Sequence, residues 1–348
     1  MATLGYVTAT DLASGLLPLY IRGDAVAQTI QDKPMLKWWE EKKKTFPGGL
    51  NFAISGPVQG SFMSDTSTLQ GYASDDQLNF GQAMNLQRWT QYGKEHNYGL
   101  IITWSELKQD GITIDDKQAV RQHGEKELFV LTDILKNRMA DFMESYARGK
   151  ARLFFLDGTQ DPKAMAGFKS LITDTPTTGV TEGLSRVTYP WWQHRANLAL
   201  TTSAENQTLC KFFQSELRLL KLFGGRPDKA FCGQGFLNAL EAEIRAKGQY
   251  TIEGFTAKGA NDFGQAEVSL KGLGTFTWEP MMDQLGETNR CYILDSRHIK
   301  VRPMEEEDDK VLNPVRPWNY LVFLHNITWT GGETVDQLNC HGVYQINA

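Results

Sequence analysis

The side chains most able to do chemistry are scattered along this sequence. No two of the six histidines stand three or four residues apart, the spacing that sets two imidazoles on one helix face around a metal ion. The four cysteines contain no Cys-x-x-Cys pair; they are Cys210, Cys232, Cys291 and Cys340. This pattern predicts buried thiols in a reducing cytoplasm rather than disulfides or a zinc site.

The motifs that bind phosphates or activate nucleophiles are also missing. Gly149-Lys150 lacks both the loop and the following hydroxyl of a phosphate-binding loop, and Gly233-Gln234-Gly235 has no third glycine in register. No Gly-x-Ser-x-Gly occurs. The acidic run 305–309 lacks the alternation and glycine of a calcium loop. We therefore predict no catalytic, cofactor-binding or metal site, although a nonlocal His–Cys or His–Asp dyad stays open.

Composition narrows the class of protein further. The chain has 348 residues, and 36 Lys and Arg stand against 41 Asp and Glu, for a formal net charge of −5. A dedicated nucleic-acid binder needs a basic footprint that this chain lacks. No apolar run is long enough to span a membrane, and the amino end does not have the pattern of a secretory signal. Length predicts two or three core-forming units, and 18 Phe with 9 Trp indicate a folded chain.

The most distinctive predicted elements are a long ribbon and a long helix. Residues 50–92 contain one Arg and no Lys, and apolar and small or polar residues alternate over 50–55, which predicts a strand. With residues 79–84 as its partner, the segment would form a long two-stranded ribbon. Residues 116–152 carry apolar side chains at helical spacing after a capping box at Asp115 and Gln118. Such a helix is about 50 Å long, which is longer than the hydrophobic core of one ordinary domain.

The rest of the chain mixes helices and strands, so the predicted fold class is α+β. Helices are expected at 211–223 and 236–246, with a strand at 228–232. Residues 292–295 and 298–301 are predicted to pair as a hairpin. Two further strands are expected on either side of Gly331-Gly332.

Aromatic and basic clusters supply the candidate binding residues. Trp191 and Trp192 have few basic neighbours, so burial in an interface is favoured over base stacking. The predicted interface set is Trp38, Trp39, Phe52, Phe80, Trp191 and Trp192. Lys42, Lys43 and Lys44 are candidates for contact with DNA, against the alternative of a solvated helix face.

One stretch resembles a known family. It begins with Asp157-Gly158-Thr159, continues with Ala166-Gly167-Phe168 and Leu171-Ile172, and ends with Gly183-Leu184-Ser185-Arg186 and Thr188-Tyr189-Pro190-Trp191-Trp192. Upstream stand Pro34-Met35-Leu36-Lys37-Trp38-Trp39, Lys42-Lys43-Lys44 and Gly48-Gly49. These motifs and the order of elements across nearly the whole chain resemble major capsid proteins of tailed double-stranded DNA bacteriophages.

The resemblance implies the Hong Kong 97-like (Johnson) capsid fold. Residues 1–49 would be an N-terminal arm, 50–100 an extended loop on a neighbouring subunit, 101–165 a peripheral domain with a spine helix, 166–299 an axial domain, and 300–348 the return to the peripheral domain. The family forms hexamers and pentamers of an icosahedral head around DNA. The resemblance implies a virion protein that is made in the host cytoplasm. Its expected partners are a portal, a separate scaffolding protein and, in addition, a cement protein.

The sequence departs from the family in one respect. Some members cross-link through a lysine of the extended loop, and residues 51–92 contain none, so we expect a shell without isopeptide bonds. An encapsulin-like shell that loads a cargo enzyme stays an alternative. A cytoplasmic α+β hydrolase and a minor tail or decoration protein are further alternatives.

Overall fold

The computed structural model describes residues 30–60, 71–78, 86–109, 125–246, 267–270, 274–315 and 320–347. The chain divides into two compact units. One comprises residues 1–31, 96–149 and 309–329, and the other comprises 32–95, 150–308 and 330–348. The two are called here the split unit and the sheet unit, in that order.

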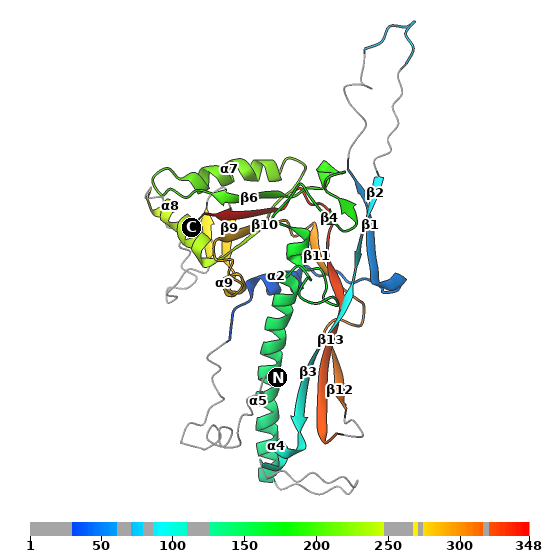
Figure 1. Cartoon of the computed structure of the whole chain (residues 1–348), viewed down its shortest axis with the longest axis vertical. Coiled ribbons are helices and arrows are strands. Elements are labelled where there is room, and N and C mark those ends of the chain that lie inside the picture. The colour runs from blue at the N-terminus through cyan, green and yellow to red at the C-terminus, as the bar shows by residue number, and fades with distance from the viewer. Residues whose placement is uncertain are drawn as a thin grey trace. The chain divides into compact units, whose positions relative to one another are not determined.

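The sheet unit is built on a six-stranded mixed sheet (Figure 1). Its order is β6-β14-β10-β7-β9-β8, in which β6 is parallel to β14, β7 is parallel to β9 and the other neighbours are antiparallel. The strands are β6 (Arg195–Leu200), β7 (Lys229–Cys232), β8 (Glu267–Leu270), β9 (Gly274–Trp278), β10 (Arg290–Leu294) and β14 (Gly342–Ile346).

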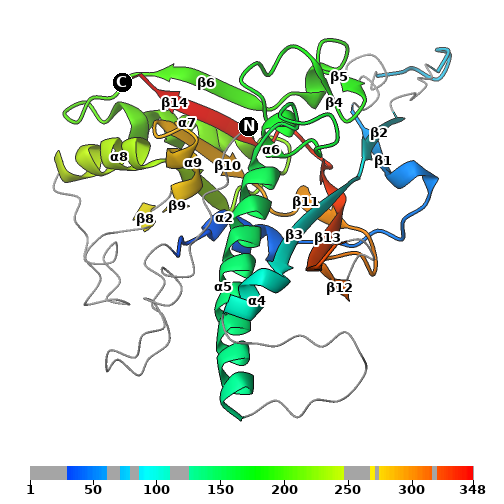
Figure 2. The same ribbon diagram turned by 60° about the horizontal axis from the view of Figure 1, so that its bottom comes forward.

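Helices α7 (Thr208–Leu220) and α8 (Gln234–Ala246) cover one face of this sheet (Figure 2). Their apolar stripes include Phe213 and Phe236, which pack with Cys291, Ile293 and Tyr344 of the strands. Alternate strand residues point to the same face, so every second position of β10 and β14 enters this core. Helix α7 begins three residues before the predicted start.

The opposite face of the sheet is covered by aromatic side chains from three helices. They are α2 (Pro34–Glu41), the end of α5 (Glu125–Phe155) and α6 (Phe168–Leu171). Trp38 of α2 lies 5.6 Å from the Phe231 ring, and Phe168 lies 4.9 Å from Tyr292. Trp39 contacts Phe168 at 5.8 Å. Helix α2 thus completes the core of the sheet unit on this face.

The split unit pairs strands with the earlier part of α5. Strand β12 (Lys310–Val315) and β3 (Lys94–Thr103) both pair with β13 (Val322–Val335), and α4 (Trp104–Gln109) follows β3. The rings of Tyr98 and His325 both contact Phe142 of α5, with centroid distances of 5.2 and 5.6 Å. The predicted long helix is therefore present over Glu125–Phe155, while its predicted capping box lies outside the described residues. No helix in the described ranges is both long and apolar enough to cross a membrane.

Two predicted connections are wrong. Strand β10 pairs with β14 and β7, whereas β11 (Ile299–Pro303) pairs with β13, so these strands do not form a hairpin. Gly331 and Gly332 lie inside β13 rather than between two strands, and they pair with Pro303 and Arg302. In both cases the partner strand is distant in sequence, and local pattern does not report such pairing.

Candidate functional site: the base of the ribbon

The ribbon of the sheet unit has two unlike faces. Strand β1 (Ala53–Gln59) pairs antiparallel with β2 (Leu86–Tyr92), from Ala53↔Tyr92 to Gln59↔Leu86 (Figure 1). On one face Ile54 and Trp89 are buried. On the other face Leu86 and Tyr92 are 70% and 57% exposed. The predicted ribbon is present, but the return strand that pairs with β1 is Leu86–Tyr92, and the predicted partner 79–84 lies outside the described residues.

Two indole rings lie directly on the ribbon backbone. Gly56 faces Trp89, and a Cβ built on Gly56 would lie 2.8 Å from that ring. At the end of β1, a Cβ on Gly60 would lie 1.9 Å from Trp191 Cε2. The Arg302 guanidinium also lies 5.8 Å from the centre of the Trp89 ring. Only glycine leaves room for these rings, so they hold the inner face of the ribbon against its own chain.

A small hairpin lies beside β2 and forms a backbone hydrogen bond with it. It consists of β4 (Val180–Thr181) and β5 (Leu184–Ser185), joined by Glu182 and Gly183 with φ of +50° and +80°. Two positive φ values are what a tight two-residue hairpin turn requires. The Glu182 carbonyl accepts a hydrogen bond from Thr90 N at 2.8 Å. The hairpin therefore continues the hydrogen bonding of the ribbon.

The Glu182 side chain joins a third element to this base. Its Oε1 accepts from Val335 N of β13 at 2.8 Å, and the residue is 5% exposed. Burial raises the pKa of the Glu182 carboxyl well above its ordinary value, despite this bond and the positive charge of Arg302. Glu333, further back in the same strand, is fully buried and its pKa is raised by burial as well. Both carboxyl groups therefore keep their protons to a higher pH than an exposed glutamate does.

The Trp191-Trp192 pair serves two elements. These residues form the short helix η2 (Pro190–Trp192). Trp192 is buried, and its Nε1 donates to the Thr181 carbonyl of the hairpin at 3.2 Å. Trp191 is half-buried between Tyr189 and the ribbon at Gly60. Trp192 thus contacts the hairpin, and Trp191 contacts the ribbon.

The other predicted interface residues have different surroundings. Trp38 and Trp39 are buried in the chain's own core, as is Trp192, so these side chains present almost no surface to a neighbour. Phe52 is half-buried, and its carbonyl accepts from Gly93 N. Phe80 lies outside the described residues. Their contact with a second chain stays a prediction.

The three candidate DNA-binding lysines follow α2. Lys42, Lys43 and Lys44 are all exposed, and Lys43 forms an ion pair with Asp308. The backbone N of Lys44 donates to the carbonyl of Val301 at 2.9 Å. The segment is thus fixed to the sheet unit while its three lysine side chains stay exposed, and its contact with DNA stays a prediction.

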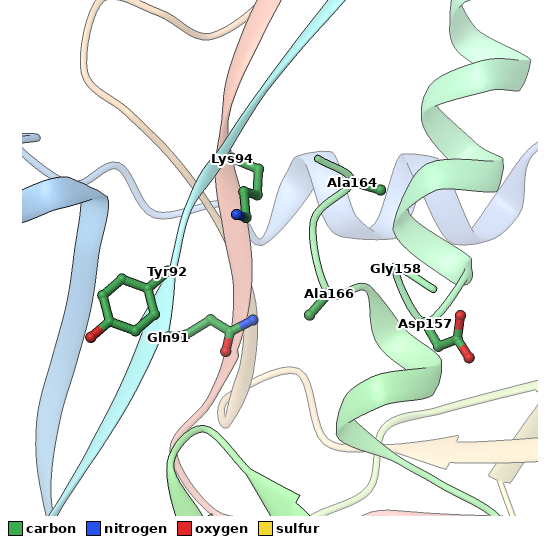
Figure 3. A pocket seen from close by; sticks show the side chains of 7 residues that line it. All are labelled: Gln91, Tyr92, Lys94, Asp157, Gly158, Ala164 and Ala166. Carbon is green, nitrogen blue, oxygen red and sulfur yellow. The ribbon is translucent and has the colours of Figure 1, made fainter. Parts of the chain in front are cut away.

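An open hollow of about 300 Å³ lies beside the ribbon base (Figure 3). It is lined by Gln91, Tyr92, Lys94, Asp157, Gly158, Ala164 and Ala166. The Asp157 carboxylate accepts from Thr159 N and Oγ1, which lowers the pKa of Asp157. None of the lining residues is a His, Cys or Ser, so this hollow lacks the residues of a Ser–His or Cys–His pair.

The described part of the chain contains no group of three or more His, Cys, Asp or Glu arranged to hold a metal ion. All four cysteines are buried and free, and burial raises the pKa of each thiol, to about 11 at Cys210. A thiol in that state is a poor nucleophile at neutral pH. Among the described residues, the distinctive feature of this surface is a ribbon whose inner face is packed and whose outer face is exposed.

Comparison with solved structures identifies the fold. A chain of the cyanophage A-1(L) capsid asymmetric unit is similar at a TM-score of 0.64 and 12% identity, over 93% of this chain and 95% of that one. A chain of the capsid of Myoviridae phage XM1 is similar at 0.53 and 12% identity, over 93% and 97%. A chain of the capsid of an empty GTA particle is similar at 0.54 and 14% identity, over 98% and 99%.

No protein-family model matches the sequence, and no curated protein matches it either. At 12–14% identity the likeness to these structures establishes the fold. It confirms the capsid fold that the sequence resemblance implied.

Proposed function

We propose that this chain is the major capsid protein of a tailed bacteriophage, which self-assembles into the icosahedral head around double-stranded DNA. The observation that carries the proposal is a shared fold over 93% of this chain and 95% of a cyanophage capsid chain. A match of that extent rests on the order of all elements rather than on one motif. The protein would belong to the virion, after synthesis and assembly in the bacterial cytoplasm.

The ribbon supports assembly from many copies of the chain. A two-stranded ribbon is marginal in water unless another surface covers it. Here the chain itself covers only the inner face, through Trp89 and Trp191. The outer face leaves Leu86 and Tyr92 in solvent. A neighbouring copy that covers this face would bury both side chains.

The proposal assigns a role to each segment of the chain. Residues 1–49 would be the arm, 50–100 the extended loop, 101–165 and 300–348 the peripheral domain, and 166–299 the axial domain of hexamers and pentamers. A scaffolding protein, a portal and a cement protein would be the other partners. None of these assignments depends on a catalytic group.

Contacts with the packaged DNA would be weak and nonspecific. The exposed ammonium groups of Lys42, Lys43 and Lys44 are the candidates. Replacing all three by Gln should lower the salt dependence of DNA retention in filled particles, since each phosphate contact contributes about 0.9 to the slope. An unchanged slope would exclude these lysines as DNA contacts.

An encapsulin-like shell is the second candidate, because a related fold can enclose a protein cargo. The solved structures reported above, from phages and a GTA particle, favour the phage head. A monomeric hydrolase is disfavoured by the same likeness.

The contents of particles separate these functions. The chain should be expressed with the neighbouring genes of its source, and the particles should be purified and treated with nuclease. We expect shells that protect double-stranded DNA. Shells that instead hold a co-purifying enzyme would support the compartment, and a small oligomer with no shell would contradict both.

A further inference from the structure

Two cysteines lie directly opposite each other in the middle of the six-stranded sheet. Cys232 of β7 and Cys291 of β10 are register partners in an antiparallel pair of strands. These strands occupy the centre of the sheet, between β14 and β9, and both cysteines are fully buried. Both thiols are free. The proposed function gives this pair of nucleophiles no role.

The hydrogen bonds beside the cysteines show which kind of cross-strand pair they form. Gly233 N donates to the Arg290 carbonyl at 3.0 Å, one position further along the two strands. Hydrogen-bonded and non-hydrogen-bonded pairs alternate in an antiparallel ladder, so Cys232 and Cys291 form a non-hydrogen-bonded pair. The Cα atoms of such a pair lie about 4.5 Å apart, and a disulfide spans about 4.4–6.8 Å between Cα atoms. The backbone therefore has the spacing that a bridge requires.

The two side chains also point to the same face of the sheet. Both belong to the core that the sheet forms with α7 and α8, as expected for directly opposed residues. Burial and then the nearby Cys232 thiol raise the pKa of the Cys291 thiol. Among the described strands, neither Cys210 nor Cys340 is the register partner of another cysteine. The geometry thus selects one pair out of the four cysteines.

One contact must change before these sulfurs can join. Cys232 Sγ donates to the Thr277 carbonyl of β9 at 3.5 Å, so in the reduced chain this thiol is directed away from β10. A thiol is a weak donor, and loss of this bond costs little. Rotation about the Cα–Cβ bond of Cys232 brings its sulfur toward Cys291 instead.

We propose that Cys232 and Cys291 are a disulfide site, reduced in the cytoplasm and bridged when the chain meets a low-molecular-weight disulfide such as oxidised glutathione. The thiolate of one cysteine attacks the S–S bond of that molecule and releases one glutathione thiolate. The thiolate of the other cysteine then displaces the second glutathione and closes the bridge. The two cysteines lose two electrons and two protons, and oxidised glutathione becomes two molecules of reduced glutathione. The inference concerns the chain alone and does not depend on the proposed shell.

Burial makes this oxidation slow. A buried thiol is scarcely ionised, so the first attack takes place when β7 and β10 separate and water reaches the pair. When the strands pair again, they bring the second sulfur onto the mixed disulfide. In a reducing cytoplasm the same pair stays as two thiols.

The bridge would close the base of a long excursion of the chain. Residues 233–290 leave the sheet at the end of β7 and return at the start of β10, and they include α8, β8 and β9. A disulfide that closes a long segment removes many conformations from the unfolded chain. The bridged protein should therefore be the more stable form.

Mapping of the thiols in the full-length protein tests the proposal. The protein is incubated with oxidised and reduced glutathione at mildly alkaline pH, in urea just below its unfolding transition, so that the strands open and close. The remaining thiols are alkylated and the digest is analysed by mass spectrometry. We expect Cys232 joined to Cys291, with Cys210 and Cys340 alkylated. If Cys232 and Cys291 remain thiols, or end as separate glutathione adducts, the proposal is overturned.

Thermal unfolding shows whether the sheet accepts the bridge without strain. The unfolding midpoint of the bridged protein should lie about 5 °C or more above that of the same sample after reduction. Cys291→Ala, treated in the same way, should show no such difference, and Cys340→Ala should behave as the wild type. An equal or lower midpoint in the bridged protein would contradict the proposal. The mass-spectrometric result needs no variant, so it decides the question even if Cys291→Ala does not fold.

Discussion

At the scale of single residues, Glu182 combines a strained backbone, a buried carboxyl group and a hydrogen bond at the base of the ribbon. A residue with a Cβ at φ +50° is strained by about 1–2 kcal/mol, and burial of its carboxyl group adds a further cost. Glycine would adopt the turn without strain but has no side chain to reach Val335 N. The hydrogen bond between Glu182 Oε1 and Val335 N is what a glutamate adds.

Removal of the Glu182 side chain tests this role. Glu182→Gly leaves the Val335 amide without its acceptor, which should cost about 1–3 kcal/mol and be partly offset by relief of the strained turn. Glu182→Gln keeps an acceptor oxygen and should lose less. Urea unfolding at pH 5 gives both free energies. Because only Glu182→Gly relieves the turn, a Gly variant at least as stable as the Gln variant would show that the bond to Val335 contributes no more than the strain of the turn costs.

The pH dependence of stability should change with the same residue. The pKa of Glu182 is raised in the folded chain, so its contribution is complete below pH 4.5, its ordinary value, and is lost as the pH rises above it. The unfolding free energy of Glu182→Gln should therefore fall less between pH 5 and pH 8 than that of the wild type. Identical slopes would mean that Glu182 does not titrate with folding.

The sequence offers no signal for Glu182. Gly183-Leu184-Ser185-Arg186 is visible as a motif, but a glutamate reads as exposed in any local pattern. Its burial depends on Thr90 and Val335, both far away in the chain. Trp191 and Trp192 were identifiable as interface-type aromatics, yet nothing local showed that one would lie on Gly60 and the other on Thr181.

At the scale of elements, the first strand of the ribbon was predictable, but the position of its partner strand and the register of their pairing were not. Alternation over 50–55 marks a strand, but the paired strand Leu86–Tyr92 is rich in polar residues and is recognisable only from Trp89 and Gly56 facing each other. The predicted hairpin of 292–301 failed because both neighbours of β10 are distant in sequence. Helices α5 and α8 were clear because their apolar spacing is local.

Packing of Trp191 on the ribbon predicts a coupled pair of substitutions. Gly60→Ala forces a Cβ into the indole and should cost about 1–3 kcal/mol of stability. In a Trp191→Ala background the same change should cost much less, since the ring is gone. Gly71→Ala is the matched control, because nothing lies within 4 Å of its Cβ position. Additive effects of the Gly60 and Trp191 changes would contradict the contact.

The bare face of the ribbon predicts an assembly defect without a folding defect. Changing Leu86 and Tyr92 together to Glu should abolish particle formation, since two charges would be buried against a neighbouring copy. The unfolding midpoint of the free chain should stay close to that of the wild type. Sedimentation measures particle formation, and circular dichroism measures the unfolding midpoint. Gln214→Glu, on the exposed side of α7, is the control. Normal particles from the double variant would show that this face stays in solvent.

At the scale of the whole molecule, the absence of lysine from residues 51–92 predicts how the proposed shell would be held together. Without that lysine the ribbon cannot supply the amine of an isopeptide bond to a neighbour. Particles boiled in detergent should therefore run as monomers of 39.2 kDa on a denaturing gel. A ladder of higher species would refute the prediction.

The fold of the whole chain was accessible from the sequence only through the resemblance of its motifs and element order. Composition and periodicity alone reach α+β, because sheet order depends on pairings such as β6 with β14 that join distant residues. The buried acids Glu182, Glu279 and Glu333 were invisible for the same reason. What the sequence did indicate is a chain whose prominent features are elongated and free of catalytic groups.

The central claim is that this chain covers its exposed apolar ribbon by assembling with copies of itself. Negative-stain microscopy of the purified protein, with sedimentation of the same sample across a dilution series, tests the claim most directly. The account predicts closed shells or capsomers of uniform size, in which Leu86 and Tyr92 are protected. A compact particle of 39.2 kDa that stays monodisperse at every concentration, with its ribbon resistant to protease, would contradict it.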